Sequence, residues 1–72
     1  MLTPDEQKVL DAIRFLNKRD NEGADFQVIS IRSHVSFEKV RKALSRLMSL
    51  GKATCIDYKY CCTTWLHERK GK

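Results

Sequence analysis

The spacing of apolar residues changes at Gly51. Before this glycine, apolar side chains recur every three or four residues in two separate stretches, which is typical of amphipathic helices. After it, residues 53–56 and 60–66 are rich in β-branched, aromatic and cysteine residues, which is typical of strands. A chain of 72 residues accommodates one small domain around a single core. We therefore expect one domain over residues 1–72, mainly α-helical with a small β-hairpin at its end.

The first helix is predicted over residues 4–19. Thr3-Pro4-Asp5-Glu6 matches a capping box, in which the threonine hydroxyl and the glutamate carboxylate each accept a backbone N–H hydrogen bond from the other residue. The polar residues 20–25 end the helix. Three apolar residues fall on one face of the predicted helix: Val9, Ile13 and Leu16.

Two further helices are predicted before Gly51. The first is short and covers residues 29–34, after residues 26–28, which form either a very short strand or an extended entry. The second covers residues 36–50, where Ser36 is a suitable N-cap and Gly51 a suitable terminator. The apolar face of this second helix contains Phe37, Val40, Leu44, Leu47 and Met48.

The last two predicted segments are a hairpin and a solvated tail, over residues 52–67 and 68–72. The turn is placed around residues 57–60, and a four-residue loop is expected because neither Asn-Gly nor Asp-Gly is present. A turn centred on Tyr58-Lys59 puts Ile56 and Trp65 on the outer face, as an apolar patch for a dimer or partner contact. A slip of one residue reverses the two faces and buries Trp65, and the sequence does not choose between these registers.

This order of elements resembles the winged helix-turn-helix domain family. Val35-Ser36 occupies the place of the family's turn before the recognition helix. The family's recognition-helix pattern V-R-x-A-L-x-x-L-x-x-x-G is similar to Val40-Arg41-Lys42-Ala43-Leu44-Ser45-Arg46-Leu47 followed by Gly51. Two departures are His34, where the family often has a glycine, and Ser33, where a core leucine is common; histidine tolerates the left-handed backbone that this turn needs. The resemblance implies three helices with a C-terminal wing of two or three strands, sequence-specific binding of double-stranded DNA, and regulation of transcription.

Charge is distributed unevenly along the chain. Residues 1–36 carry five basic and six acidic side chains, a net charge of −1, whereas residues 37–72 carry nine basic and three acidic ones, a net charge of +6. This asymmetry favours a polyanionic partner on the C-terminal side. Helix 36–50 carries long cationic and short polar side chains away from its apolar face, as contacts to phosphates and base edges require. The predicted DNA-contacting residues are Ser36, Lys39, Arg41, Lys42, Ser45, Arg46 and Lys59.

Two other functions are compatible with the same residues. A winged-helix protein-interaction module would use the apolar surface of the hairpin, for which the candidates are Ile56, Tyr58, Tyr60 and Trp65. A thiol-based redox-sensing or metal-sensing regulator would use Cys55, Cys61 and Cys62, with a cross-strand Cys55–Cys62 disulfide as its switch. Reduced cysteines that act as small apolar side chains are the simpler interpretation.

The sequence contains no motif typical of an enzyme, a metal or cofactor site, a membrane span or a secreted disulfide framework. No paired carboxylates, Ser/His/Asp arrangement or phosphate-binding glycine loop stands out, so we expect neither an enzyme nor a small-molecule substrate. The spacing of histidines and cysteines matches no zinc site, and no cofactor is expected. No apolar run is long enough to span a membrane, and three cysteines do not resemble a secreted disulfide framework. We therefore expect a cytoplasmic homodimer, because two copies on adjacent half-sites double the DNA contacts of one small module.

Overall fold

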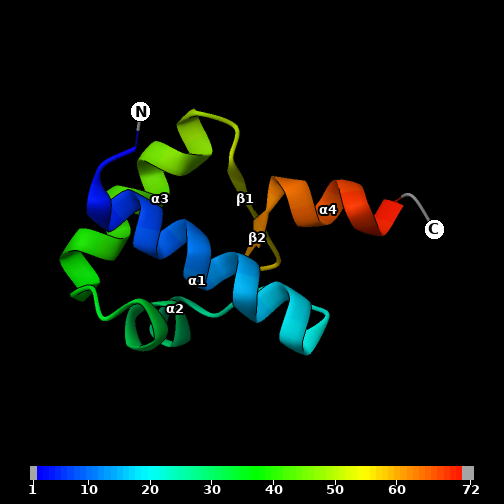
Figure 1. Cartoon of the computed structure of the whole chain (residues 1–72), viewed down its shortest axis with the longest axis horizontal. Helices are drawn as coiled ribbons and strands as arrows, with labels where there is room; N and C mark the ends of the chain where they lie inside the picture. Colours follow the sequence, from blue (N-terminus) through cyan, green and yellow to red (C-terminus); the bar gives the residue numbers. More distant parts are fainter. Residues whose placement is uncertain (1, 71–72) are drawn as a thin grey trace.

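The computed structural model of the chain describes residues 2–70, and their side chains as far as Glu68. This part of the chain is mainly helical with one two-stranded antiparallel hairpin, the α+β class that the sequence predicted. Helix α1 crosses the molecule, and α3 and α4 lie toward opposite ends of its longest axis (Figure 1). The elements in chain order are α1 Pro4–Asp20, α2 Phe26–Ser33, α3 Phe37–Ser49, β1 Ala53–Ile56, β2 Lys59–Cys62 and α4 Thr63–Lys70.

Helix α1 begins with the predicted capping box. The Glu6 backbone N–H donates to Thr3 Oγ1 at 3.2 Å, and the Thr3 N–H donates to Glu6 Oε1 at 3.0 Å. The helix ends at Asp20, one residue later than predicted, where Asn21 takes the left-handed conformation with φ 54°. The buried face of α1 consists of Val9, Ala12, Ile13, Leu16 and Asn17.

Helix α2 starts three residues earlier than predicted. Phe26–Val28 forms the first turn of this helix, and not the short strand or extended entry that was predicted. Strand-like pairing occurs just before it, where Ala24 exchanges two backbone hydrogen bonds of 2.8 Å with Tyr60. Asp25 then takes the N-cap position. His34 ends the helix at φ 59° and ψ 33°, the left-handed conformation expected of it in this turn.

Helix α3 lies within the predicted range. Ser36 occupies the N-cap position, but its side chain makes no capping hydrogen bond. At the other end Gly51 has φ 74°, the Gly51 N–H donates to the Met48 carbonyl at 3.1 Å, and the Lys52 N–H donates to the Leu47 carbonyl at 2.9 Å. This is a Schellman motif, so Gly51 terminates the helix as predicted. The buried side chains of α3 are Val40, Ala43, Leu44 and Leu47.

The hairpin turn has two residues, not the four that were predicted. Asp57 and Tyr58 both have positive φ, 52° and 66°, which is the signature of a type I′ turn. The register therefore pairs Ile56 with Lys59, where the sequence predicted Cys61. Such turns match the right-handed twist of the flanking strands even without their preferred Asn-Gly sequence. The register differs by two residues from the predicted one, so Ile56 and Cys61 still lie on the same face of the hairpin, the one expected to point outward. Ile56 is exposed on that face, whereas Cys61 is buried.

Helix α4 covers residues 63–70, where the sequence predicted the end of the hairpin and the start of a solvated tail. Residues 71–72 of the predicted tail lie outside the described part of the chain. The second strand stops at Cys62, and Thr63 begins the helix. The Thr63 N–H donates to the Lys52 carbonyl at 3.1 Å, and its hydroxyl donates to the Gly51 carbonyl at 2.8 Å. The helical turn that follows directs Trp65 into the core, where it is 4% exposed. Of the two positions that the sequence left open for Trp65, the buried one is therefore found, although it results from a helix and not from a slipped strand register. The predicted strand beyond Cys62 is wrong, because tertiary anchoring overrides the strand propensity of this segment.

Buried Asn17 joins α1 to β2. Its Nδ2 donates to the carbonyls of Glu22 at 3.0 Å and Tyr60 at 3.2 Å, and its Oδ1 accepts from the Cys62 N–H at 2.7 Å. The side chain is completely inaccessible to solvent. These bonds hold the hairpin against the rest of the chain and thereby set its position relative to α3.

Candidate nucleic-acid interface

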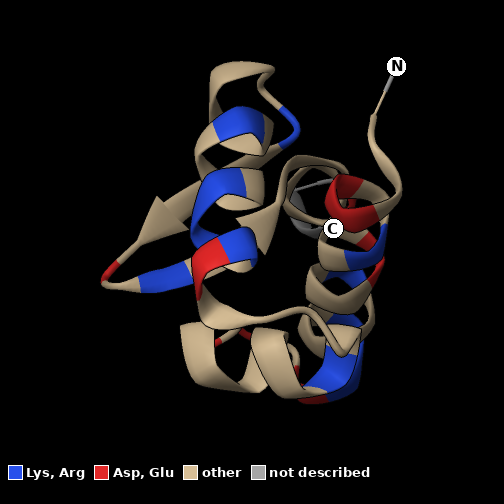
Figure 2. Cartoon of the chain, turned by 90° about the vertical axis from the view of Figure 1, so that its left-hand side faces the viewer, with Lys and Arg blue, Asp and Glu red and all other residues tan. Residues whose placement is uncertain are grey.

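The outward face of α3 lies at one end of the molecule. Figure 2 shows this end, with Lys and Arg residues along the helix on the left and the hairpin tip projecting beside it. The opposite face of α3 is firmly packed, since Val40 and Leu47 are fully buried and Leu44 is 2% exposed. All the predicted DNA-contacting residues are exposed: Ser36, Lys39, Arg41, Lys42, Ser45, Arg46 and Lys59. The predicted division into an apolar inner face and a cationic outer face therefore holds for Val40, Leu44 and Leu47. It does not hold for Phe37 and Met48, which were assigned to the apolar face but are 52% and 38% exposed.

Carboxylates border one edge of this cationic face. Arg46 Nε lies 3.8 Å from Glu6 Oε2, and the Glu6 side chain is only 13% exposed. Asp5 and Glu6 also line a hollow of about 120 Å³ between α1 and α3, together with Lys39 and Lys42. A polyanion that approaches α3 from the α1 side meets these carboxylates, so the favourable path runs over the middle of α3 and toward the hairpin.

The cations in the middle of α3 form no salt bridge with the described residues, although carboxylates lie near them. Asp5 and Glu6 line the same hollow as Lys39 and Lys42, and the exposed Glu38 lies in the first turn of α3. Within the described part of the chain, Lys39, Arg41 and Lys42 form no salt bridge, whereas Arg46 pairs with Glu6. On the hairpin, Lys59 Nζ lies 3.6 Å from Glu22 Oε1, and both side chains are about half exposed. Exposed pairs of this kind are weak and are exchanged readily for a stronger anion. Lys39, Arg41 and Lys42 are thus the cations of α3 that an incoming anion can pair with directly, and Glu38 is the opposing charge on the same helix.

The predicted partner surface of the hairpin is not continuous. Trp65 lies in the core and Tyr60 packs partly against it, so these two side chains do not form the outer apolar patch. Ile56 at 48% and Tyr58 at 94% exposed remain accessible, the latter at the tip of the turn. The alternative function as a protein-interaction module thereby loses the largest side chain on which it relied.

The cysteines are arranged differently from the proposed redox switch. Cys55 is exposed and lies opposite Tyr60, whereas Cys62 is buried and lies opposite Ala53. The cross-strand Cys55–Cys62 pair on which the redox alternative relied is therefore absent from the described hairpin, because the type I′ turn shifts the register by two residues. Cys61 is also buried, against the loop between α1 and α2, where a β-carbon added at Gly23 would lie 3.3 Å from Cys61 Sγ. Cys61 and Cys62 thus fill space in the core, as their interpretation as small apolar side chains requires.

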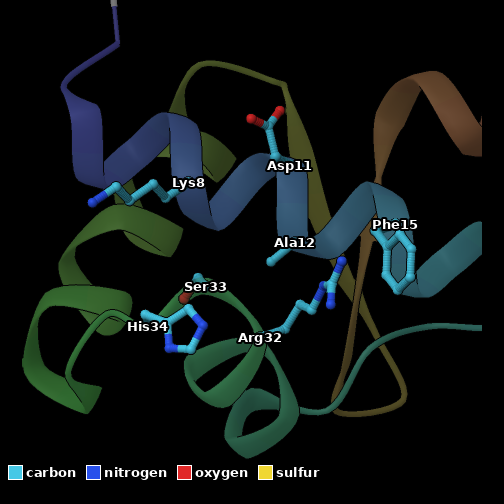
Figure 3. A pocket seen from close by; sticks show the side chains of 7 residues that line it. All are labelled: Lys8, Asp11, Ala12, Phe15, Arg32, Ser33 and His34. Atoms are coloured by element: carbon cyan, nitrogen blue, oxygen red, sulfur yellow. The ribbon is translucent and has the colours of Figure 1, made fainter.

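A separate hollow of about 560 Å³ lies between α1 and α2 (Figure 3). Three of its polar side chains, those of Asp11, Arg32 and Ser33, already have partners within the chain. The Arg32 guanidinium lies over the Phe15 ring at 3.9 Å from the centroid, and Asp11 accepts a hydrogen bond from Gln7 Nε2 at 2.9 Å. No residue of α3 lines this hollow, which therefore does not belong to the cationic face.

The sequence-based prediction missed two residues that shape the candidate interface. Glu6 pairs with a cation of α3, and Asn17 attaches the hairpin to α1. Glu6 was recognised only as a capping residue, and nothing in the sequence indicates that its carboxylate also reaches Arg46. The role of Asn17 could have been predicted, since this residue falls four positions after Ile13 on the apolar face of α1. A polar residue at such a position indicates a buried hydrogen-bonding role.

Comparisons with known proteins identify no relative. No protein-family model, curated protein or solved structure matches the chain. In residues 2–70, no helix combines the length and apolarity needed to cross a membrane, and no three His, Cys, Asp or Glu side chains group as metal ligands would. A functional assignment therefore depends on the geometry and charge of the α3 face.

Proposed function

We propose that this chain is a winged-helix regulator of transcription that binds double-stranded DNA. Helix α3 enters the major groove, and the β1–β2 hairpin acts as the wing beside it. The single observation that carries the proposal is the α3 face itself: Lys39, Arg41 and Lys42 are exposed and without salt bridges within the described chain, on a helix whose other side is buried. Its 13 residues give a length of about 20 Å, long enough to follow the groove across several base pairs.

The pairing of the hairpin supports the same assignment. Ala24 pairs with Tyr60 of β2, so β2 lies between β1 and a one-residue bridge from the segment that joins α1 to α2. A wing of two strands with a minimal third one is what the winged-helix resemblance implies. Because Tyr60 and Asn17 secure β2, the tip with Lys59 is held at a defined place beside α3.

Two copies of the chain are expected to bind together. A module of this size contacts only a few base pairs, and specific sites commonly consist of two half-sites about one helical turn apart. The proposed homodimer predicts cooperative binding to a duplex with two half-sites and independent binding to a single one.

A salt titration tests the proposal. Fluorescence anisotropy of a labelled random duplex of 30 base pairs is measured against the full chain at 50 to 300 mM KCl. If four or five cations contact phosphates, the slope of log K against log salt is about −4. Absence of binding at 50 mM KCl, or an affinity that does not change with salt, would contradict the proposal.

Substitution of Glu6 by glutamine is expected to tighten DNA binding about two- to fivefold at low salt. Glutamine is compatible with a capping box, so α1 keeps its N-terminus while the negative charge beside Arg46 disappears. Asp11→Asn provides the matched control, because it removes the same charge from α1 at a position outside the α3 face. Equal gains for both variants would show that net charge, and not the Glu6–Arg46 contact, sets the affinity.

A further inference from the structure

A hollow of about 300 Å³ lies beside α3, between this helix, the start of α2 and strand β2. Its volume is at the lower end of the range of small-molecule sites. Apolar and aromatic side chains form most of its walls, and the polar groups come from three residues. The lining residues are Phe26, Arg41, Leu44, Ser45, Met48 and Tyr60.

The walls of this hollow are held in place by the fold. The Phe26 ring packs against the Phe37 ring with 5.6 Å between centroids. Tyr60 is fixed through its backbone. Its N–H donates to the Ala24 carbonyl, and its carbonyl accepts hydrogen bonds from the Ala24 N–H and from Asn17 Nδ2. Leu44 forms part of the core and is 2% exposed. The walls formed by Phe26, Leu44 and Tyr60 are therefore ordered before a ligand enters, which lowers the entropic cost of binding. The exposed side chains of Arg41 and Met48 are the parts that a ligand has to order.

The polar groups of the hollow are available to a ligand. Within the described chain, the Arg41 guanidinium and the hydroxyls of Ser45 and Tyr60 make no hydrogen bond or salt bridge. Among the described residues that line the hollow there is no carboxylate, and Arg41 is the one charged residue. The hollow of Figure 3 differs on both points, because Asp11 contributes a negative charge there and Arg32 is stacked on Phe15.

We propose that the hollow beside α3 binds a small aromatic carboxylate. The ring lies among Phe26, Met48 and Tyr60, where aromatic and thioether contacts are favourable. The carboxylate pairs with Arg41, whose planar guanidinium suits it, and accepts a hydrogen bond from Ser45. Arg41 is also a DNA-contacting residue under the proposed function, so the ligand and DNA compete for it. That regulatory consequence rests on the proposed function, whereas binding of the ligand does not.

An NMR titration of the ¹⁵N-labelled full chain with 2-naphthoate tests the site without DNA. We expect saturable amide shifts at α3 and around residues 26 and 60, with a Kd of about 1 mM. The uncharged analogue 2-naphthalenemethanol is expected to bind about tenfold more weakly, because it cannot form the ion pair. Shifts that do not saturate, or that map outside the lining residues, would overturn the proposal.

Two variants separate the parts of the site. Arg41→Gln should weaken naphthoate binding about tenfold, whereas Arg14→Gln, the same change on the exposed side of α1, should leave it unaltered. Ser45→Leu fills the hollow at an exposed helical position that tolerates leucine, and should abolish binding of both compounds. Equal losses for Arg41→Gln and Arg14→Gln would show attraction by net charge only and would refute the site.

The competition is measured separately on labelled duplex DNA. Naphthoate at ten times its Kd should raise the apparent Kd for DNA about tenfold in the unmodified protein. An unchanged affinity for DNA would overturn the shared use of Arg41. If the chain binds no DNA at all, the proposed function fails while the NMR result still decides the ligand site.

Discussion

Replacement of Arg41 and Lys42 by glutamate is expected to weaken binding to duplex DNA at least about 100-fold at 50 mM salt. The double variant removes two cations that have no salt bridge in the described chain and places two carboxylates toward the phosphates. Both side chains are exposed, so the core beneath α3 stays intact. Anisotropy with the labelled duplex gives the loss of affinity, and circular dichroism verifies that the helices are retained.

The control for this result is Lys8→Glu with Arg14→Glu. It changes the net charge by the same amount at exposed positions of α1, outside the α3 face. We expect its loss of affinity to be several-fold smaller, and smaller still at higher salt. If both double variants lose affinity equally, the attraction is not localised on α3. If neither loses affinity, the winged-helix protein-interaction module becomes the better interpretation.

The second large effect is expected on stability, where Asn17→Leu should lower the free energy of unfolding by about 3 kcal/mol. Leucine cannot accept the hydrogen bond from the buried Cys62 N–H or donate to the Glu22 carbonyl. Trp65 is the sole tryptophan and is buried, so its fluorescence reports unfolding in urea. For a protein of this size, the expected change is a large fraction of the total stability.

Lys18→Leu is the control for this change, because it adds the same side chain to the exposed neighbouring position of α1. Its effect should stay within about 0.5 kcal/mol. If Asn17→Leu were as stable as the unmodified protein, the hairpin would not depend on Asn17 for its attachment to α1. The position of the proposed wing would then need another explanation.

Several elements of the fold could be predicted because their signals are local. The capping box at Thr3 and Glu6 and the glycine terminator at Gly51 depend on hydrogen bonds between residues three to five positions apart. The amphipathic pattern of residues 36–50 likewise depends only on helical geometry. Such features can be predicted from a sequence because the residues that contact each other lie within one or two helical turns along the chain.

The end of the chain was mispredicted because its structure depends on distant partners. Thr63-Thr64-Trp65 has the composition of a strand, yet Thr63 bonds to Gly51, 12 residues away, and a helix follows. The turn at Asp57-Tyr58 has a sequence that is unusual for type I′, and the register it accompanies is secured by Asn17 and by the bridge from Ala24. Local propensity differs between strand and helix by at most about 1 kcal/mol per residue. A net hydrogen bond contributes about 1 kcal/mol and burial of a large apolar side chain about 2 kcal/mol, so several tertiary contacts together outweigh it.

The helical period of residues 36–50 was sufficient to predict that Val40, Leu44 and Leu47 are buried and that the cations of α3 are exposed, because this period fixes the direction of each side chain. Which cations form salt bridges could not be predicted in this way, since Glu6 contacts Arg46 and Glu22 contacts Lys59 from other segments of the fold. The tertiary structure also brought Phe26 and Tyr60 together beside Arg41, from segments far apart along the chain. Helical periodicity is a property of one segment, whereas ion pairs and hollows arise where separate segments meet.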